Sequence, residues 1–112
     1  MEKNIRYGIL YEYYKDLLSE KQQESIEQYH YEDLSLTEIA ELQNISKQAV
    51  SNNIKRAELL LDEYEEKLRL YRKNNDMTSF LEDLDHVIKE NTDKKTYETI
   101  NKMISSMISK LN

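Results

Sequence analysis

The near-absence of chain-breaking residues is the feature that most restricts how this chain can fold. The 112 residues include no proline, and Gly8 is the only glycine. A strand-rich protein of this size would need many tight turns, and such turns depend on glycine and proline. Apolar residues recur instead at steps of three and four, which is the spacing of helices that bury one face. The sequence therefore predicts an all-α fold.

Length and composition narrow the class of protein. At 13.5 kDa the chain has room for one hydrophobic core, so we expect a single domain over residues 1–112. The chain has no cysteine, which excludes disulfides and thiolate metal sites. No apolar run approaches the roughly 18 residues that span a bilayer, and the first residues do not resemble a signal peptide. We therefore expect a cytoplasmic protein with no membrane partner.

Apolar spacing and capping residues predict six helices. Ser19 with Gln22, and Ser35 with Glu38, fit capping boxes, in which each side chain binds the backbone N–H of the other residue. Asn44 suits the left-handed conformation in which many helices end. The expected helices cover about residues 3–18, 19–30, 35–43, 47–73, 77–90 and 93–111, with Asn74-Asn75-Asp76 as the break after the fourth.

The tyrosines of the first expected helix raise the question of base stacking. Tyr7, Tyr11 and Tyr14 lie at helical spacing with Leu10 and Leu17. Stacked bases require exposed aromatic rings, whereas these rings share a face with leucines. We therefore expect them in the core.

Residues 35–58, SLTEIAELQNISKQAVSNNIKRAE, have the pattern of a helix-turn-helix. The motif needs a short helix, a tight turn and a second helix that enters the major groove. Ala40 provides the small residue where two helices cross, Asn44 stands at the turn, and Ser46 is expected to cap the second helix. Four apolar residues are spaced to fix the motif to its support: Ile39, Ile45, Val50 and Ile54. We expect a helix-turn-helix core over about 19–73 and a helical extension over about 77–112.

The outward face of the second helix carries hydrogen-bond donors and cations, and no carboxylate occurs between Glu41 and Glu58. Gln48 and Asn52 can each make two hydrogen bonds to adenine. Lys55 and Arg56 suit phosphates. The net charge of −6 argues against a broadly basic, sequence-independent binder, and a merely solvated helix face remains the alternative. The candidate double-stranded DNA-binding residues are Ser46, Lys47, Gln48, Ser51, Asn52, Lys55 and Arg56.

Two family resemblances rest on these segments. SEKQ at 19–22 and LSLTEIAELQNISKQAVSNNIKRAELLL at 34–61 resemble region four of sigma-70-type factors. More closely, LYEYY at 10–14, LLSEKQ at 17–22, YEDLSLTEIAE at 31–41, SKQAV at 46–50 and NIKRAE at 53–58 resemble the YlxM family of small helical proteins from Gram-positive bacteria. The resemblance covers about residues 7–70.

The YlxM resemblance implies a DNA-binding regulatory protein, with the seven candidate residues facing the DNA. It also implies a link to the signal recognition particle pathway through neighbouring genes. The alternative function is therefore a non-enzymatic accessory factor that binds the GTPase or the RNA of that particle. An acidic protein would favour a basic partner.

The last expected helix has an apolar face that needs a partner. Its apolar residues step alternately by three and four, as in a short coiled-coil seam. Packing within one chain and a homodimer joined through the C-terminal helices both remain open, and we name the homodimer as the expected partner. The apolar residues are Tyr97, Ile100, Met103, Ile104, Met107, Ile108 and Leu111.

Catalytic and metal sites have weak support in the sequence. Glu82, Asp85 and His86 share a helix face, but no fourth ligand lies near them. A single glycine cannot make a phosphate-binding loop, and neither histidine stands where it would activate a serine. We expect no enzyme, no cofactor and no metal.

Overall fold

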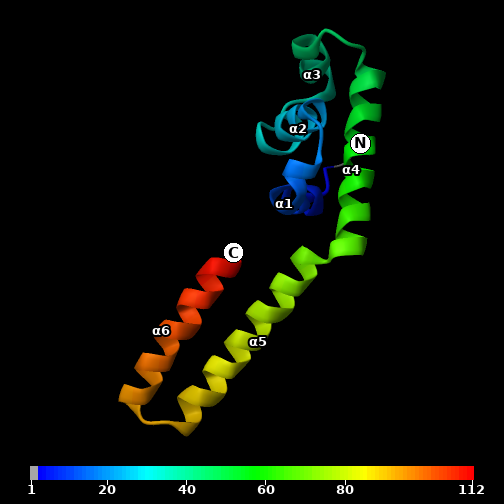
Figure 1. Ribbon diagram of the computed structural model, residues 1–112. Helices are drawn as coiled ribbons and strands as arrows, with labels where there is room; N and C mark the ends of the chain where they lie inside the picture. Colours follow the sequence, from blue (N-terminus) through cyan, green and yellow to red (C-terminus); the bar gives the residue numbers. More distant parts are fainter. Residues whose placement is uncertain (1–2) are drawn as a thin grey trace. The chain divides into compact units, whose positions relative to one another are not determined.

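The computed structural model describes residues 3–112, which form helices joined by short turns and include no strand (Figure 1). The all-α prediction is confirmed. The elements are α1 (Ile5–Tyr14), the 3₁₀ turn η1 (Lys15–Leu17), α2 (Glu20–Ile26), the π turn η2 (Glu27–Tyr31), α3 (Leu36–Gln43), α4 (Lys47–Leu68), α5 (Leu70–Asn91) and α6 (Lys94–Leu111). None of these helices is long and apolar enough to cross a membrane.

The helices form two compact units, one ending at Arg69 and the other covering Leu70–Asn112. The predicted end of the fourth helix is wrong. The fourth helix ends at Leu68 rather than near Lys73, because Arg69 adopts the left-handed conformation with φ 56°. Residues 74–76, at which the sequence predicted the end of a helix, lie inside α5. Asn74 is held there because its Nδ2 donates to the Leu111 carbonyl at 2.8 Å.

The predicted caps are confirmed. Ser19 and Ser35 make complete capping boxes with the residues three positions on. Asn44 adopts φ 55° and ψ 46°, so α3 ends where the left-handed residue was expected. Ser46 caps the start of α4, and its side chain accepts a hydrogen bond from the Ala49 backbone N–H at 3.0 Å.

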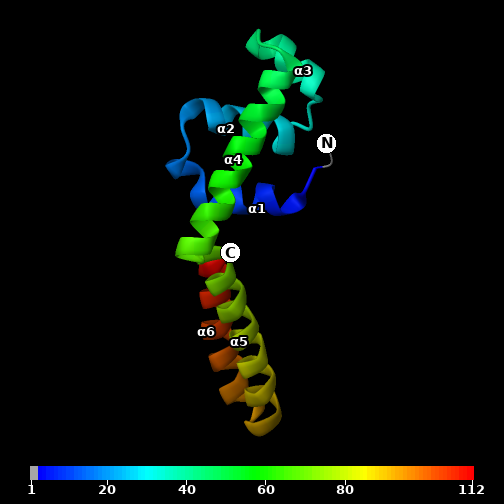
Figure 2. The ribbon, with the colours of Figure 1, turned by 90° about the vertical axis from the view of Figure 1, so that its right-hand side faces the viewer.

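The first unit is built along α4, with α1, α2 and α3 packed against it (Figures 1 and 2). One stripe of α4 is completely buried: Val50, Ile54, Ala57 and Leu61. The spacing of these residues, four, three and four, keeps them on one face of the helix. The long helix is therefore the support on which the other helices of this unit are assembled.

Tyr11 and Tyr14 of α1 lie in this core, as expected, whereas Tyr7 is only half-buried. Tyr11 and Tyr14 are 2% and 1% exposed. Their hydroxyls donate to Glu27 at 2.7 Å and to Glu65 at 2.5 Å. The helix itself is shorter than expected, because it passes into the 3₁₀ turn at Lys15.

The second unit is a hairpin in which α5 and α6 run antiparallel (Figure 1). Polar contacts mark its seam. The Asp85 carboxylate accepts hydrogen bonds from the Tyr97 hydroxyl at 2.9 Å and from the Asn101 amide at 2.8 Å. Among the described residues of the hairpin, Ile104 alone is buried.

Candidate nucleic-acid interface

The α3–turn–α4 segment has the geometry of a helix-turn-helix. Asn44, Ile45 and Ser46 connect the two helices. Behind the turn lies a small hydrophobic core of Tyr29 and the predicted support residues Ile39, Val50 and Ile54. Partly buried apolar side chains pack around it, including the expected small residue at the helix crossing: Leu34, Leu36, Ala40 and Ile45. This core determines which face of α4 is buried and which face is exposed.

The exposed face of α4 carries the predicted candidate residues. Ser51 is half-buried. The other six are exposed: Ser46, Lys47, Gln48, Asn52, Lys55 and Arg56. They occupy roughly the first three turns of α4, because an α-helix has about 3.6 residues per turn. The Gln48 side-chain amide donates to the Asn52 side-chain oxygen at 3.1 Å. The structure therefore brings the candidate residues together on one surface, which we call the α4 face.

The α4 face is locally cationic within an acidic unit. Residues 1–69 contain nine lysines and arginines and fifteen aspartates and glutamates. No carboxylate lies between Glu41 and Glu58, whereas three cations do. The first N–H groups of a helix also lack intrahelical partners and favour anions. The local charge can thus attract a polyanion that the rest of the unit would repel.

A largely buried polar pair, His30 and Glu58, lies where the cationic segment ends, and no motif in the sequence predicted it. The Glu58 carboxylate lies 4.0 Å from His30 Nε2, and the two side chains are 13% and 5% exposed. Among the described residues His30 Nε2 has no hydrogen-bond partner. Burial, with a smaller contribution from Asp62, raises the pKa of Glu58 to about 7, and Lys55 opposes the rise. Burial also lowers the pKa of His30.

We expect Glu58→Gln to change how stability depends on pH. The folded-state pKa of Glu58 is raised from 4.5 to about 7, so the folded chain binds this proton more tightly than the unfolded chain. Its contribution to stability is therefore complete below pH 4.5 and is lost as pH rises through 7. Glutamine cannot ionise, so the variant should match wild type near pH 4.5 and exceed its free energy of unfolding by up to about 3 kcal/mol at pH 8.

Urea unfolding from pH 4.5 to 8 measures this difference. Because His30 lies 4.0 Å from Glu58, the difference between the two proteins reports the carboxylate together with its effect on His30. The matched control is Glu63→Gln, an exposed position on the same helix, which should leave the wild-type profile unchanged. A constant difference between wild type and Glu58→Gln across this range would contradict the assignment.

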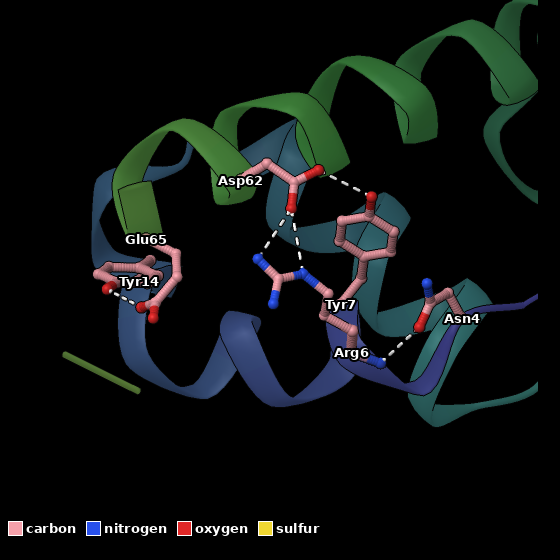
Figure 3. A network of polar contacts seen from close by, with 6 residues as sticks. All are labelled: Asn4, Arg6, Tyr7, Tyr14, Asp62 and Glu65. Atoms are coloured by element: carbon pink, nitrogen blue, oxygen red, sulfur yellow. Dashed lines mark hydrogen bonds and ion pairs between the residues drawn. The ribbon is translucent and has the colours of Figure 1, made fainter. Parts of the chain in front are cut away.

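A second network ties α1 to α4 beyond the α4 face (Figure 3). Asp62 accepts hydrogen bonds from the Tyr7 hydroxyl at 2.8 Å and from Arg6 Nε at 3.2 Å. The hydrogen bond to Asp62 is the main cause that raises the pKa of Tyr7 to about 12. In this network Arg6 and Asp62 form an ion pair with each other. It helps to position α4 but adds no cation to the α4 face.

The three possible metal ligands Glu82, Asp85 and His86 are not grouped as a metal site in the described part of the structure. Asp85 is engaged in the hairpin seam by Tyr97 and Asn101. His86 is exposed and lies 3.3 Å from Glu90 on its own helix. Within residues 3–112 there is no group of three His, Cys, Asp or Glu residues placed to hold a metal ion.

These features define a small all-α protein of the helix-turn-helix class. Residues 1–104 match the UPF0122 family, described as "Putative helix-turn-helix protein, YlxM / p13 like". A UPF0122 protein of Oceanobacillus iheyensis is 44% identical over 103 residues, which is 92% of this chain and 95% of the relative. One of Clostridium novyi is 41% identical over 115 residues, covering 96% of this chain and all of the relative. The chain belongs to the UPF0122 family, which confirms the YlxM resemblance.

Proposed function

We propose that this protein is a non-enzymatic, cytoplasmic regulator that binds double-stranded DNA through the α4 face. The observation that carries the proposal is the exposed, carboxylate-free surface at the start of the second helix of a helix-turn-helix. In such motifs this is the helix that enters the major groove. The comparisons give no support to the signal recognition particle as a partner.

The α4 face offers both kinds of contact that a DNA reader needs. Gln48 and Asn52 can each make paired hydrogen bonds to the N6 and N7 atoms of adenine. They are hydrogen-bonded to each other in the free protein, so base contacts would replace an existing bond. Lys47, Lys55 and Arg56 suit phosphates, which fix register and supply most of the affinity.

We further propose that the protein binds DNA as a homodimer joined through its C-terminal helices. The support is the second unit, a hairpin of two helices with little buried surface of its own. A dimer would carry two α4 faces, and dimeric helix-turn-helix proteins read two half-sites.

The test is fluorescence anisotropy with a pool of random-sequence duplexes at low and at physiological salt. Binding should be measurable at low salt and should fall steeply as salt is raised, because cations that contact phosphates release counterions. Absence of binding even at low salt would contradict the proposal and leave the helix-turn-helix as a scaffold.

Gln48→Ala and Asn52→Ala are expected to relax sequence preference more than they weaken overall affinity. Each removes side-chain atoms that can read a base edge, and a good paired contact is worth about 1–3 kcal/mol of discrimination. Repeated selection from the random pool would measure this, with wild type and Glu63→Ala as references. If both variants enriched the same sequences as wild type, these two side chains would not read bases.

A further inference from the structure

The α5–α6 hairpin exposes an apolar surface that its own two helices do not cover. Phe80 and Met103 are 60% and 69% exposed. The surface, which we call the hairpin face, consists of Met77, Phe80, Leu84 and Val87 on α5 and of Met103 and Met107 on α6. Three of the four methionines in the chain therefore lie in it.

The six side chains lie on the same side of the hairpin. Each comes directly before a residue that is at least half-buried: Thr78, Leu81, Asp85, Ile88, Ile104 and Ile108. The offset from the seam is thus one residue, in the same direction, on both helices. In antiparallel helices an equal offset turns toward the same side of the pair. The exposed residues therefore make one continuous apolar face.

This face is large for a surface that meets only water. A helical hairpin cannot enclose a core by itself, and here Ile104 is its one buried residue among those described. Apolar clusters of this kind usually mark sites of protein association. On α5 the spacing of 77, 80, 84 and 87 is the alternation of three and four that suits packing against another helix.

The charge distribution indicates that the partner is a second copy of the chain. Residues 70–112 contain seven basic and seven acidic residues, so two hairpins do not repel, although the whole chain has a net charge of −6. The balance is uneven between the helices: residues 70–91 have five acidic and three basic side chains, and residues 92–112 have two and four. The α5 stripe is bordered at seven-residue spacing by Asp76, Asp83 and Glu90, all exposed.

We propose that two hairpin faces pack together about a two-fold axis and form an antiparallel four-helix bundle. Each α5 would lie against α6 of the other copy, so that its acidic border meets exposed lysines of α6, including Lys95, Lys102 and Lys110. Six apolar side chains from each copy would form the centre, as in other helical bundles. This proposal names the surface that joins the dimer proposed above, and it does not depend on DNA binding.

The first test is the mass of the full chain in solution, without DNA, from 1 to 200 µM by light scattering or sedimentation. Wild type should have twice the monomer mass of 13.5 kDa. Phe80→Glu should be a monomer with unchanged helical circular dichroism, because the side chain is exposed within its own chain. The matched control, Leu42→Glu, changes a residue 67% exposed in the first unit and should remain dimeric. A monomeric wild type at 200 µM would overturn the proposal, as would a folded, fully dimeric Phe80→Glu.

A second test needs no substitution. In a mixture of copies with labelled methionine methyl groups and unlabelled copies, Met103 and Met107 should show intermolecular nuclear Overhauser effects to the Phe80 ring. A dimer without such contacts would place the interface elsewhere and overturn the proposal. Both tests omit DNA, so their failure leaves the α4 face untouched, and failure of the anisotropy experiment leaves the hairpin face untouched.

Discussion

Simultaneous replacement of Lys47, Lys55 and Arg56 by alanine is expected to weaken binding to random-sequence duplex DNA on the order of 100-fold at 0.1 M salt. The three side chains are exposed on the α4 face, and the segment between Glu41 and Glu58 contains no carboxylate that could neutralise them. Each phosphate contact contributes about 0.9 to the slope of log affinity against log salt, so the slope should fall by about 2 to 3 per copy. Anisotropy titrations over a range of salt concentrations measure both quantities.

The matched control removes the same charge elsewhere on the first unit. Lys15, Lys21 and Lys67 are exposed and lie outside the α4 face. Their replacement by alanine should change affinity by roughly threefold at most, because only long-range attraction is lost and salt screens it. Equal losses in the two triple variants would show that net charge, and not the α4 face, determines binding.

Ile54→Ala is expected to lower the free energy of unfolding of the first unit by about 3 kcal/mol. Ile54 is fully buried and belongs to the core behind the turn, with Tyr29, Ile39 and Val50. Truncation of a buried isoleucine to alanine removes apolar contact and leaves a cavity, which costs about 2–5 kcal/mol. Amide hydrogen exchange along α4 reports this unit directly, and protection there should fall by about a hundredfold.

Leu59→Ala is the control for that experiment. It lies on the same helix and is 63% exposed, so its truncation should change the free energy of unfolding by less than about 0.5 kcal/mol. If Ile54→Ala and Leu59→Ala altered exchange equally, Ile54 would not have the central role in packing that its burial indicates.

The helix starts could be predicted because their causes are local. Ser35 and Glu38 satisfy each other's backbone N–H groups within four residues, and Asn44 tolerates positive φ without help from distant parts of the chain. The buried residues of the helix-turn-helix could also be predicted, because apolar residues at helical spacing identify the buried face of a helix whatever it packs against. The outward positions follow from them by exclusion.

The break at Arg69 could not be predicted in the same way. Leucine, arginine and lysine all favour helices, so the residues around 69 resemble a helix interior. Asparagine and aspartate at 74–76 look like a break, yet each costs less than about 1 kcal/mol in a helix. The hydrogen bond from Asn74 to the Leu111 carbonyl offsets that cost and depends on a residue 37 positions away.

The polar pair beneath the α4 face shows the same limit. His30 and Glu58 are 28 positions apart, and neither stands in a motif that would reveal the other. The packing of η2 against α1 and α3 places His30 4.0 Å from Glu58 of α4. The hairpin face is an intermediate case, because the sequence showed an apolar side of the last helix but not which of its residues would stay exposed.

DNA binding through the α4 face is tested most sharply by a nuclear magnetic resonance titration of the labelled protein with a short duplex taken from the selection experiment. We expect the largest shift changes on the backbone amides of residues 46–56 and on the side-chain amides of Gln48 and Asn52. Changes centred on the α5–α6 hairpin or on α2, with residues 46–56 unaffected, would contradict DNA binding through the α4 face.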